Sequence, residues 1–140
     1  MSIFLRIVSP CMLFLSFLVY GQGNVEFLPD DAEQNGTSFA SCNDQGVVGG
    51  VYTIDCPSNI NLPNNKTVGL SQTPLRLIIN GDLNLNGTDI NPNGSSRDLL
   101  VVVTGNLNPG NSNTTINANL DITGSLNGAN NNAISGGLSI

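Results

Sequence analysis

The sequence predicts an all-β protein built as a β-solenoid, a β-helix-like stack of repeated coils. A short pattern of a polar residue, Gly, a polar residue, Leu and Asn occurs three times in the carboxyl-terminal half. Internal repetition with a period of about 20 residues or more is typical of solenoids. Around each copy, hydrophobic and polar residues alternate, which indicates strands with one buried face. The copies occupy residues 80–84, 104–108 and 123–127.

Residues 1–23 have the composition of a secretory signal peptide. Arg6 precedes the apolar run 11–19, and glycines follow it. This order of positive charge, apolar run and small residues is that of a leader removed on export. The run is short for a membrane span, so an uncleaved anchor is the less favoured alternative. We do not expect a lipid-attached cysteine at Cys11, because most of the apolar run follows it.

The exported portion begins with a weakly patterned segment and a pair of cysteines. Residues 24–41 show little periodicity and are predicted to be a flexible lead-in. Cys42 and Cys56 are the only cysteines after the leader, and in an oxidising compartment such a pair predicts a disulfide that closes a small loop. A metal site made of two thiols, in a chain without His, is the less favoured alternative.

Residues 42–74 contain short strand patterns interrupted by Gly and Pro. Residues 46–54 are predicted to form one strand after a glycine turn, and alternation at 60–62 and 68–70 predicts two more. We expect this section to form irregular first coils, stapled by the disulfide. It would cap the amino end of the solenoid, where unpaired backbone is otherwise exposed.

Alternation within residues 75–140 predicts which side chains face the interior of the repeat region. The glycines of the three motifs share the phase of the hydrophobic positions, so we expect Gly81, Gly105 and Gly124 on the inner face. A glycine there removes a side chain where the coil bends or where backbones approach closely. The predicted inward hydrophobic residues are Leu75, Leu77, Ile79, Leu83, Leu85, Leu99, Val101, Val103, Leu107, Leu120, Ile122 and Leu126.

The repeats favour a solenoid over an antiparallel sandwich. Each motif is followed by an Asn- and Gly-rich turn and then by an isolated isoleucine. These isoleucines are Ile90, Ile116 and Ile134, and they predict a second strand in each coil. Asn-Gly dipeptides also suit the hairpins of a sandwich. A sandwich does not require the same motif in the same phase three times. Outward Asn residues at matching positions predict side-chain amide ladders between coils.

The interval between the first two motifs contains a candidate interaction loop. Residues 91–98 are a run of turn formers, which predicts a surface excursion from one coil. Asp89, Arg97 and Asp98 flank or end this run and form the one candidate site in the sequence. Solvated loop charges are the simpler interpretation.

The remaining charges do not suggest catalysis or metal binding. Polysaccharide hydrolysis or lyase chemistry needs clustered carboxylates or a carboxylate beside a basic group, and Asp82 and Asp121 fall at unmatched positions of different coils. The nonapeptide pattern of calcium-binding rolls is absent. We therefore predict no enzyme activity, no cofactor and no obligatory metal. The exported portion is acidic, which makes nucleic acid and anionic membranes poor partners.

The carboxyl end of the sequence lacks a visible cap. Ile140 continues the alternation phase of Ile122, and no polar capping segment follows. We expect that the chain is the first part of a longer protein whose solenoid continues. The alternative is that the open edge pairs with another chain.

Three stretches resemble a known bacterial family. Residues 50–56, 60–63 and 77–86 are similar to the amino-terminal region of the Q component of the mannose-sensitive hemagglutinin (MSHA) pilus biogenesis system of Gram-negative bacteria. The resemblance implies an exported protein of the periplasm, outer membrane or cell surface. It also implies non-catalytic assembly or adhesion, with other envelope or pilus proteins or its own downstream domains as partners.

The sequence also allows an alternative function, in which the protein binds or processes carbohydrate. Extracellular β-helices also bind or process polysaccharides, and a glycan is the partner that this alternative requires. Few aromatic side chains are available to stack on sugars, with Phe39 and Tyr52 the only ones after Phe27. A structural or adhesive module is therefore the favoured prediction.

Overall fold

The computed structural model describes residues 25–27, 39, 41–70, 73–110, 113–128 and 131–140. This part of the chain is all-β and winds as a β-solenoid of about three turns, so the predicted fold class is confirmed. The predicted signal peptide, residues 1–23, and most of the predicted lead-in lie outside the described residues.

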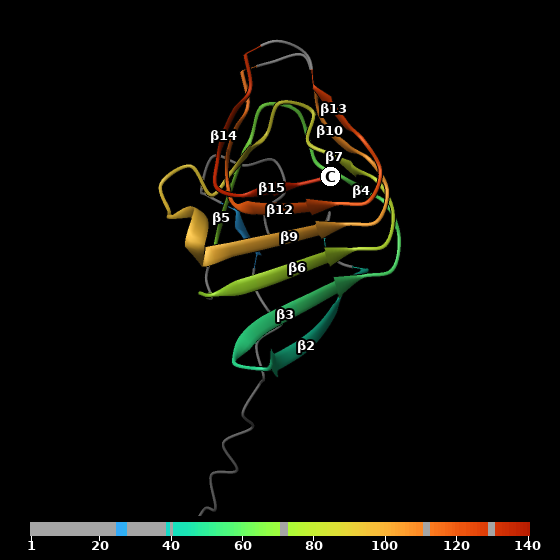
Figure 1. Ribbon diagram of the computed structural model, residues 1–140, viewed down its shortest axis with the longest axis vertical. Helices are drawn as coiled ribbons and strands as arrows, with labels where there is room; N and C mark the ends of the chain where they lie inside the picture. The colour runs from blue at the N-terminus through green and yellow to red at the C-terminus, as the bar shows by residue number, and fades with distance from the viewer. Residues whose placement is uncertain (1–24, 28–38, 40, 71–72, 111–112, 129–130) are drawn as a thin grey trace, which may run out of the picture.

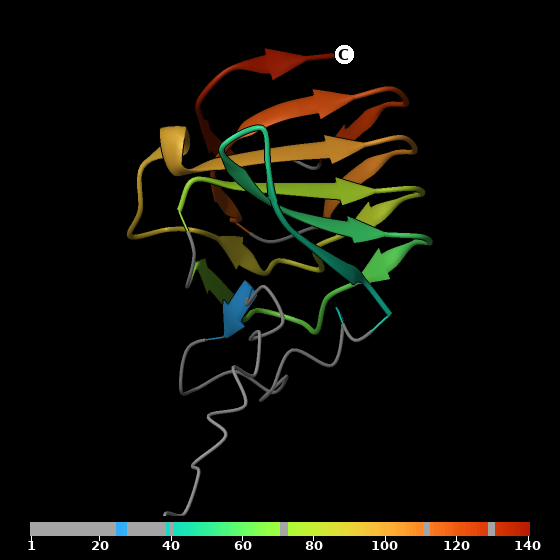
Figure 2. The same ribbon diagram turned by 90° about the horizontal axis from the view of Figure 1, so that it is seen from below.

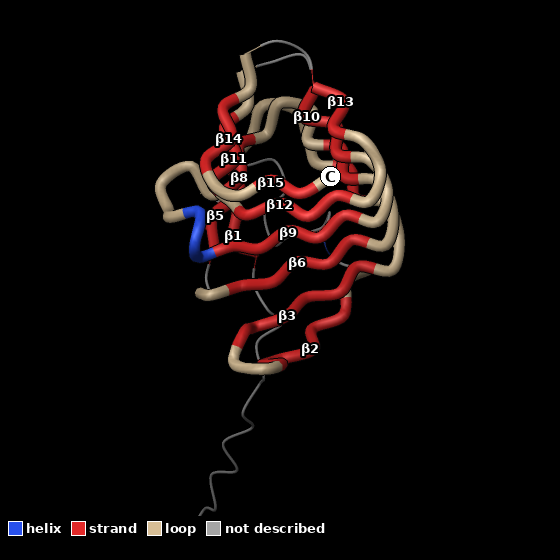
Figure 3. Tube along the Cα trace, in the orientation of Figure 1, coloured by secondary structure: helices blue, strands red, loops and turns tan. Residues whose placement is uncertain are grey.

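Each coil contributes one strand to each of three sheets, named here A, B and C (Figures 1 and 3). Sheet B has the order β15-β12-β9-β6-β3-β2. Its strands are β2 (Asn43–Val48), β3 (Val51–Cys56), β6 (Leu75–Ile79), β9 (Leu99–Val103), β12 (Asn119–Ile122) and β15 (Leu138–Ser139).

The other two sheets are built from shorter strands. Sheet C consists of β4 (Ile60–Asn61), β7 (Leu83–Asn84), β10 (Leu107–Gly110) and β13 (Leu126–Gly128). Sheet A consists of β1 (Val25–Phe27), β5 (Thr67–Leu70), β8 (Asp89–Ile90), β11 (Thr115–Asn117) and β14 (Ala133–Ser135).

Equivalent hydrophobic residues of successive coils stack into buried columns. In sheet B, Ile54, Leu77, Val101 and Leu120 lie in register on parallel strands, and all four are at most 5% exposed. Consecutive coils pair in parallel, which excludes the antiparallel sandwich. Most of the predicted inward hydrophobic residues are buried, and only Leu126, in the outer coil, is half-buried. Full burial of such an aliphatic side chain contributes about 1.5–3 kcal/mol.

The repeat glycines lie at the corner between sheets B and C and do not point into the core. The N–H of Gly105 donates to the carbonyl oxygen of Gly81 (2.9 Å), and Gly124 donates to Gly105 (3.0 Å). A Cβ on Gly105 would lie 2.7 Å from the carbonyl oxygen of Gly81. The predicted inward orientation is therefore wrong, whereas the predicted close approach of backbones is correct.

The amino end of the solenoid is more regular than the sequence predicted. Residues 46–54 form two strands and not one, because β2 turns back through Gly49 and Gly50, both with positive φ, and pairs antiparallel with β3. Since β3 pairs in parallel with β6, the regular coils begin at Val51, within the predicted cap. Figure 2 shows the β2–β3 hairpin crossing in front of strands β6 and β9.

A short strand from the predicted lead-in also belongs to the fold. β1 pairs antiparallel with β5, with Glu26 opposite Gly69. Residues 25–27 therefore form a strand within the segment that the sequence predicted to be a flexible lead-in. Antiparallel strands thus cover the first coil in sheets A and B, where unpaired edge groups would otherwise remain.

At the other end, β15 is the outermost strand of sheet B and pairs only with β12 in the described chain. Leu138 is 48% exposed and Ile140 is 68% exposed. The hydrophobic positions of the last coil thus lack the cover that equivalent residues have in the inner coils.

Candidate functional site

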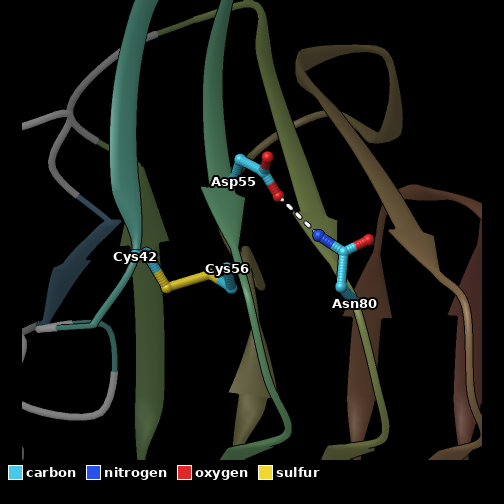
Figure 4. The surroundings of a disulfide bond; sticks show 4 residues. All are labelled: Cys42, Asp55, Cys56 and Asn80. Carbon is cyan, nitrogen blue, oxygen red and sulfur yellow. Dashed lines mark hydrogen bonds between the residues drawn. A yellow bond between two sulfur atoms is a disulfide. The ribbon is translucent and has the colours of Figure 1, made fainter.

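The predicted disulfide between Cys42 and Cys56 is present (Figure 4). It ties the residue before β2 to the last residue of β3, and Cys56 is fully buried. Beside it, the amide nitrogen of Asn80 donates to Asp55 Oδ1 at 2.8 Å. This contact links the first coil to the second. The region stabilises the amino end of the solenoid and offers no free thiol.

The candidate loop at residues 91–98 leaves the solenoid between β8 and β9, as predicted. Its first residue, Asn91, is only 6% exposed and adopts positive φ. The Asn91 side-chain nitrogen donates to the carbonyl oxygens of Ser95 (3.1 Å) and Asn117 (3.0 Å). The loop is thus fixed to its own turn and to the following coil.

The tip of the loop ends in a short 3-10 helix, η2 (Ser96–Asp98). Ser95 caps it, because Ser95 Oγ accepts from the Arg97 N–H at 3.2 Å. Asp98 Oδ2 accepts from the Ser95 N–H at 3.1 Å, which completes a capping box. The carboxylate of Asp98 therefore has a structural partner, and the exposed Arg97 lies in the middle of the helix.

Asp89 serves a different contact. It lies on β8, and its Oδ1 accepts from the Thr115 N–H at 2.6 Å. In the described chain, no hydrogen bond or ion pair joins Arg97 to Asp89 or Asp98. The structure therefore places the three candidate residues around one loop without bringing them together as a site.

A ladder of asparagine side chains runs along the outer face of sheet C, as the sequence predicted. Each side-chain nitrogen donates to the side-chain oxygen of the preceding coil: Asn84 to Asn61 at 2.6 Å, Asn108 to Asn84 at 2.7 Å, and Asn127 to Asn108 at 3.0 Å. Such side-chain amide ladders add cohesion between stacked parallel strands.

A second polar column, which the sequence analysis missed, runs beside this ladder. Here a side-chain oxygen accepts from the backbone N–H of the next coil: Asn59 from Asp82 at 2.8 Å, Asp82 from Asn106 at 2.7 Å, and Asn106 from Ser125 at 3.0 Å. The sequence feature that could have predicted this column is the polar residue that follows Gly in each motif. Asp82 is thus part of the coil-to-coil bonding and not a free surface carboxylate.

The solenoid interior contains an apolar cavity of about 20 Å³. Its walls are aliphatic and aromatic side chains from several coils. The volume is sufficient for about one water molecule, but a buried water needs polar partners that these walls do not supply. Ligand pockets for small molecules measure about 300–1,000 Å³, so this cavity is a packing defect and not a ligand site.

Two broader features concern metals and membranes. Among the described residues, no three His, Cys, Asp or Glu side chains gather in a position to hold a metal ion. The same part of the chain contains no helix long and apolar enough to cross a membrane. The predicted lack of a metal, of a cofactor and of catalysis remains a prediction.

The fold defines the class of the protein, which is a disulfide-bonded β-solenoid. The chain matches no protein-family model, and comparisons with curated proteins and with solved structures gave no match. The resemblance to the MSHA Q component therefore remains a prediction.

Proposed function

We propose that the protein is an exported, non-catalytic structural or adhesive module of the bacterial cell envelope or pilus system. The observation that supports this proposal most strongly is the bonding between coils. Parallel backbone pairing, the asparagine ladder and the second polar column connect each coil to the next. A stack bonded in this way is a rigid spacer, which suits a module that holds loops away from a surface.

The loop at residues 91–98 is the feature that such a module would display. Asn93, Gly94, Ser95 and Arg97 are exposed, whereas Asn91 fixes the base of the loop. A loop that is held at its base presents a defined shape to a partner at a low entropic cost. Other envelope or pilus proteins, or further domains of the same protein, are the proposed partners.

Export is the part of the proposal that the leader and the disulfide support. Residues 1–23 have the composition of a signal peptide, and disulfides persist in oxidising compartments such as the periplasm and cell surface. The proposed location is therefore the periplasm, the outer membrane or the cell surface.

Export can be tested by expressing the full chain in a Gram-negative host beside a variant that lacks residues 1–23. We expect the full chain in the envelope fraction, with Cys42 and Cys56 protected from alkylation after denaturation. The leaderless variant should stay in the cytoplasm with both thiols reactive. Recovery of the full chain in the cytoplasm with free thiols would refute export.

A carbohydrate-binding solenoid remains the second candidate, because Arg97 lies on an exposed loop. A glycan array probed with the exported chain would distinguish the two functions. Reproducible binding that is lost in an Arg97→Ala variant, but retained in the matched Arg76→Ala variant on sheet B, would favour the carbohydrate function. Equal binding by both variants would not support this loop as the site.

A further inference from the structure

Several asparagines of the described chain are followed directly by glycine, and this dipeptide is chemically labile. They are Asn80, Asn86, Asn93 and Asn127. In Asn-Gly the backbone nitrogen of the glycine can attack the side-chain amide carbon and expel ammonia, because glycine has no Cβ to hinder the approach and its backbone is permissive. The attack requires an asparagine side chain that is free to turn toward that nitrogen. The contacts of each side chain therefore decide which of these residues can react in the folded protein.

At all of these positions except Asn93, the fold holds the side-chain nitrogen, which is the group that must leave. Each of these nitrogens donates a hydrogen bond to the preceding coil: Asn80 to Asp55 Oδ1 at 2.8 Å, Asn86 to the Leu62 carbonyl oxygen at 2.7 Å, and Asn127 to Asn108 Oδ1 at 3.0 Å. At Asn86 the nucleophile is held as well, because the N–H of the buried Gly87 donates to the Pro109 carbonyl oxygen at 2.7 Å. Reaction at these positions therefore requires local opening of the stack.

Asn93 lies in a different environment. It occupies the third position of a turn in the loop at residues 91–98, which projects from the stack between β8 and β9 (Figure 1). Its side chain is exposed and takes part in no hydrogen bond or ion pair within the described chain. The Gly94 N–H donates to the Asn91 carbonyl oxygen at 3.1 Å and must leave it before reacting. That bond closes an exposed turn, where local opening is easiest.

The base of the loop requires the glycine that makes Asn93 reactive. A Cβ on Gly94 would overlap the side-chain oxygen of Asn91. Asn91 cannot easily move aside, because it is only 6% exposed and its side-chain nitrogen is bonded to the carbonyl oxygens of Ser95 and Asn117. The packing that fixes the loop therefore also keeps a glycine directly after Asn93.

We propose that Asn93 is a site of spontaneous deamidation, with water as the co-reactant. The Gly94 nitrogen bonds to Asn93 Cγ, the Cγ–Nδ2 bond breaks, and the proton of the Gly94 nitrogen leaves with Nδ2 as ammonia. Water then opens the resulting succinimide at either carbonyl and gives aspartate or isoaspartate. The loop gains one negative charge near Arg97 and, in the isoaspartate product, one additional backbone carbon in the turn. The inference does not depend on export or on the display role of the loop.

The test compares these positions within one molecule, so that each serves as a control for the others. The folded full chain is incubated in mildly alkaline buffer, digested with pepsin at acid pH, and analysed by mass spectrometry that distinguishes aspartate from isoaspartate. We expect Asn93 to convert at least about fivefold faster than Asn80, Asn86 or Asn127, since one net hydrogen bond slows a step that must break it by about this factor. In urea the four rates should converge. Circular dichroism at early time points confirms that the folded sample stays folded.

Two further asparagines complete the design. Asn113 is also exposed but precedes Thr114, and it should stay intact because a β-branched side chain hinders the backbone nitrogen. Asn35, which precedes a glycine, lies outside the described residues and is followed separately on its own peptide. The inference is overturned if Asn93 in the folded protein converts no faster than the three held asparagines. It is also overturned if the preference for Asn93 persists unchanged in urea, because local sequence and not the fold would then set the rate.

Discussion

Gly105 illustrates how single residues set the distance between coils. Its N–H donates to Gly81, its carbonyl oxygen accepts from Gly124, and a Cβ would overlap the backbone of the preceding coil. Coil-to-coil spacing at this corner therefore depends on the absence of a side chain.

Gly105→Ala should destabilise the protein by about 1–3 kcal/mol, the usual cost of overpacking a tight contact. Gly137→Ala is the matched control, because a Cβ there would meet its nearest neighbour at 3.4 Å, in ordinary contact. Urea unfolding of both variants measures the difference. Equal stability of the two variants would show that the corner can expand without cost.

Tyr52 reports on the β2–β3 hairpin. Its hydroxyl donates to the Asp44 carboxylate, and burial, followed by this contact with Asp44, raises the pKa of Tyr52 to about 12. An unfolded tyrosine has a pKa near 10. Above pH 10 the unfolded chain therefore loses this proton before the folded chain does, and the contribution of Tyr52 to stability falls between about pH 10 and about pH 12.

In protein that lacks residues 1–23, Tyr52 is the only tyrosine. Ultraviolet absorbance of the phenolate should thus give a single titration near pH 12 in the folded protein and near pH 10 in urea. Asp44→Asn should shift the native titration toward lower pH, because the negative charge beside the hydroxyl is removed. A native midpoint near 10 would mean that the hydroxyl does not contact Asp44 in solution.

At the scale of the strand, the asparagine ladder makes a prediction of its own. Asn84 donates to Asn61 and accepts from Asn108, so Asn84→Asp removes the donor and places a carboxylate against the Asn61 oxygen. We expect a loss of about 1 kcal/mol, typical of one broken hydrogen bond, and a larger loss above the pKa of the new carboxyl group.

Asn119→Asp introduces the same charge and is the matched control. The Asn119 side-chain oxygen only accepts, from the Gly137 N–H at 2.8 Å, and an aspartate oxygen can do the same. Thermal melting of the two variants at pH 7 and pH 3 separates the effect of the lost donor from that of the added charge. If Asn119→Asp were as destabilising as Asn84→Asp, the ladder would have no specific role.

Strand-level features also show what the sequence could and could not predict. Alternation alone identified the buried residues, because burial of one face imposes a period of two wherever a strand forms. Leu83 and Leu107 are thus buried as predicted. The same signal could not separate β2 from β3, because Gly49 and Gly50 interrupt a Val-rich run that has the composition of one strand.

The candidate site was harder to predict than the fold. The sequence located the excursion loop by its turn formers, but its three charged residues take separate roles that depend on contacts distant in sequence. Asp89 contacts Thr115 of the next coil, whereas Asp98 caps a local helix. The orientation of Gly81 was likewise decided by the neighbouring coil and not by the phase of its own strand.

At the scale of the whole molecule, stability comes from columns of aliphatic residues closed by three sheets. The columns are continuous through the inner coils and are covered at the amino end by β1 and β2. In the last coil, Leu138 and Ile140 are exposed. We therefore expect hydrogen exchange to be slowest in β6 and β9 and fastest in β15, because local opening is easiest where fewest contacts must break.

The central structural claim is that adjacent residues of β9 point to opposite sides of the sheet, and one pair of variants tests it. Val101 is 2% exposed and faces the interior, whereas Val102 points outward and is partly exposed. An unpaired carboxylate in an apolar interior costs many kcal/mol, against a folding free energy of about 5–15 kcal/mol. The measurement is the far-ultraviolet circular dichroism spectrum and thermal melt of Val101→Asp beside those of Val102→Asp. The solenoid predicts an unfolded Val101→Asp and a folded, cooperatively melting Val102→Asp. Two folded variants, or an unfolded Val102→Asp beside a folded Val101→Asp, would contradict it.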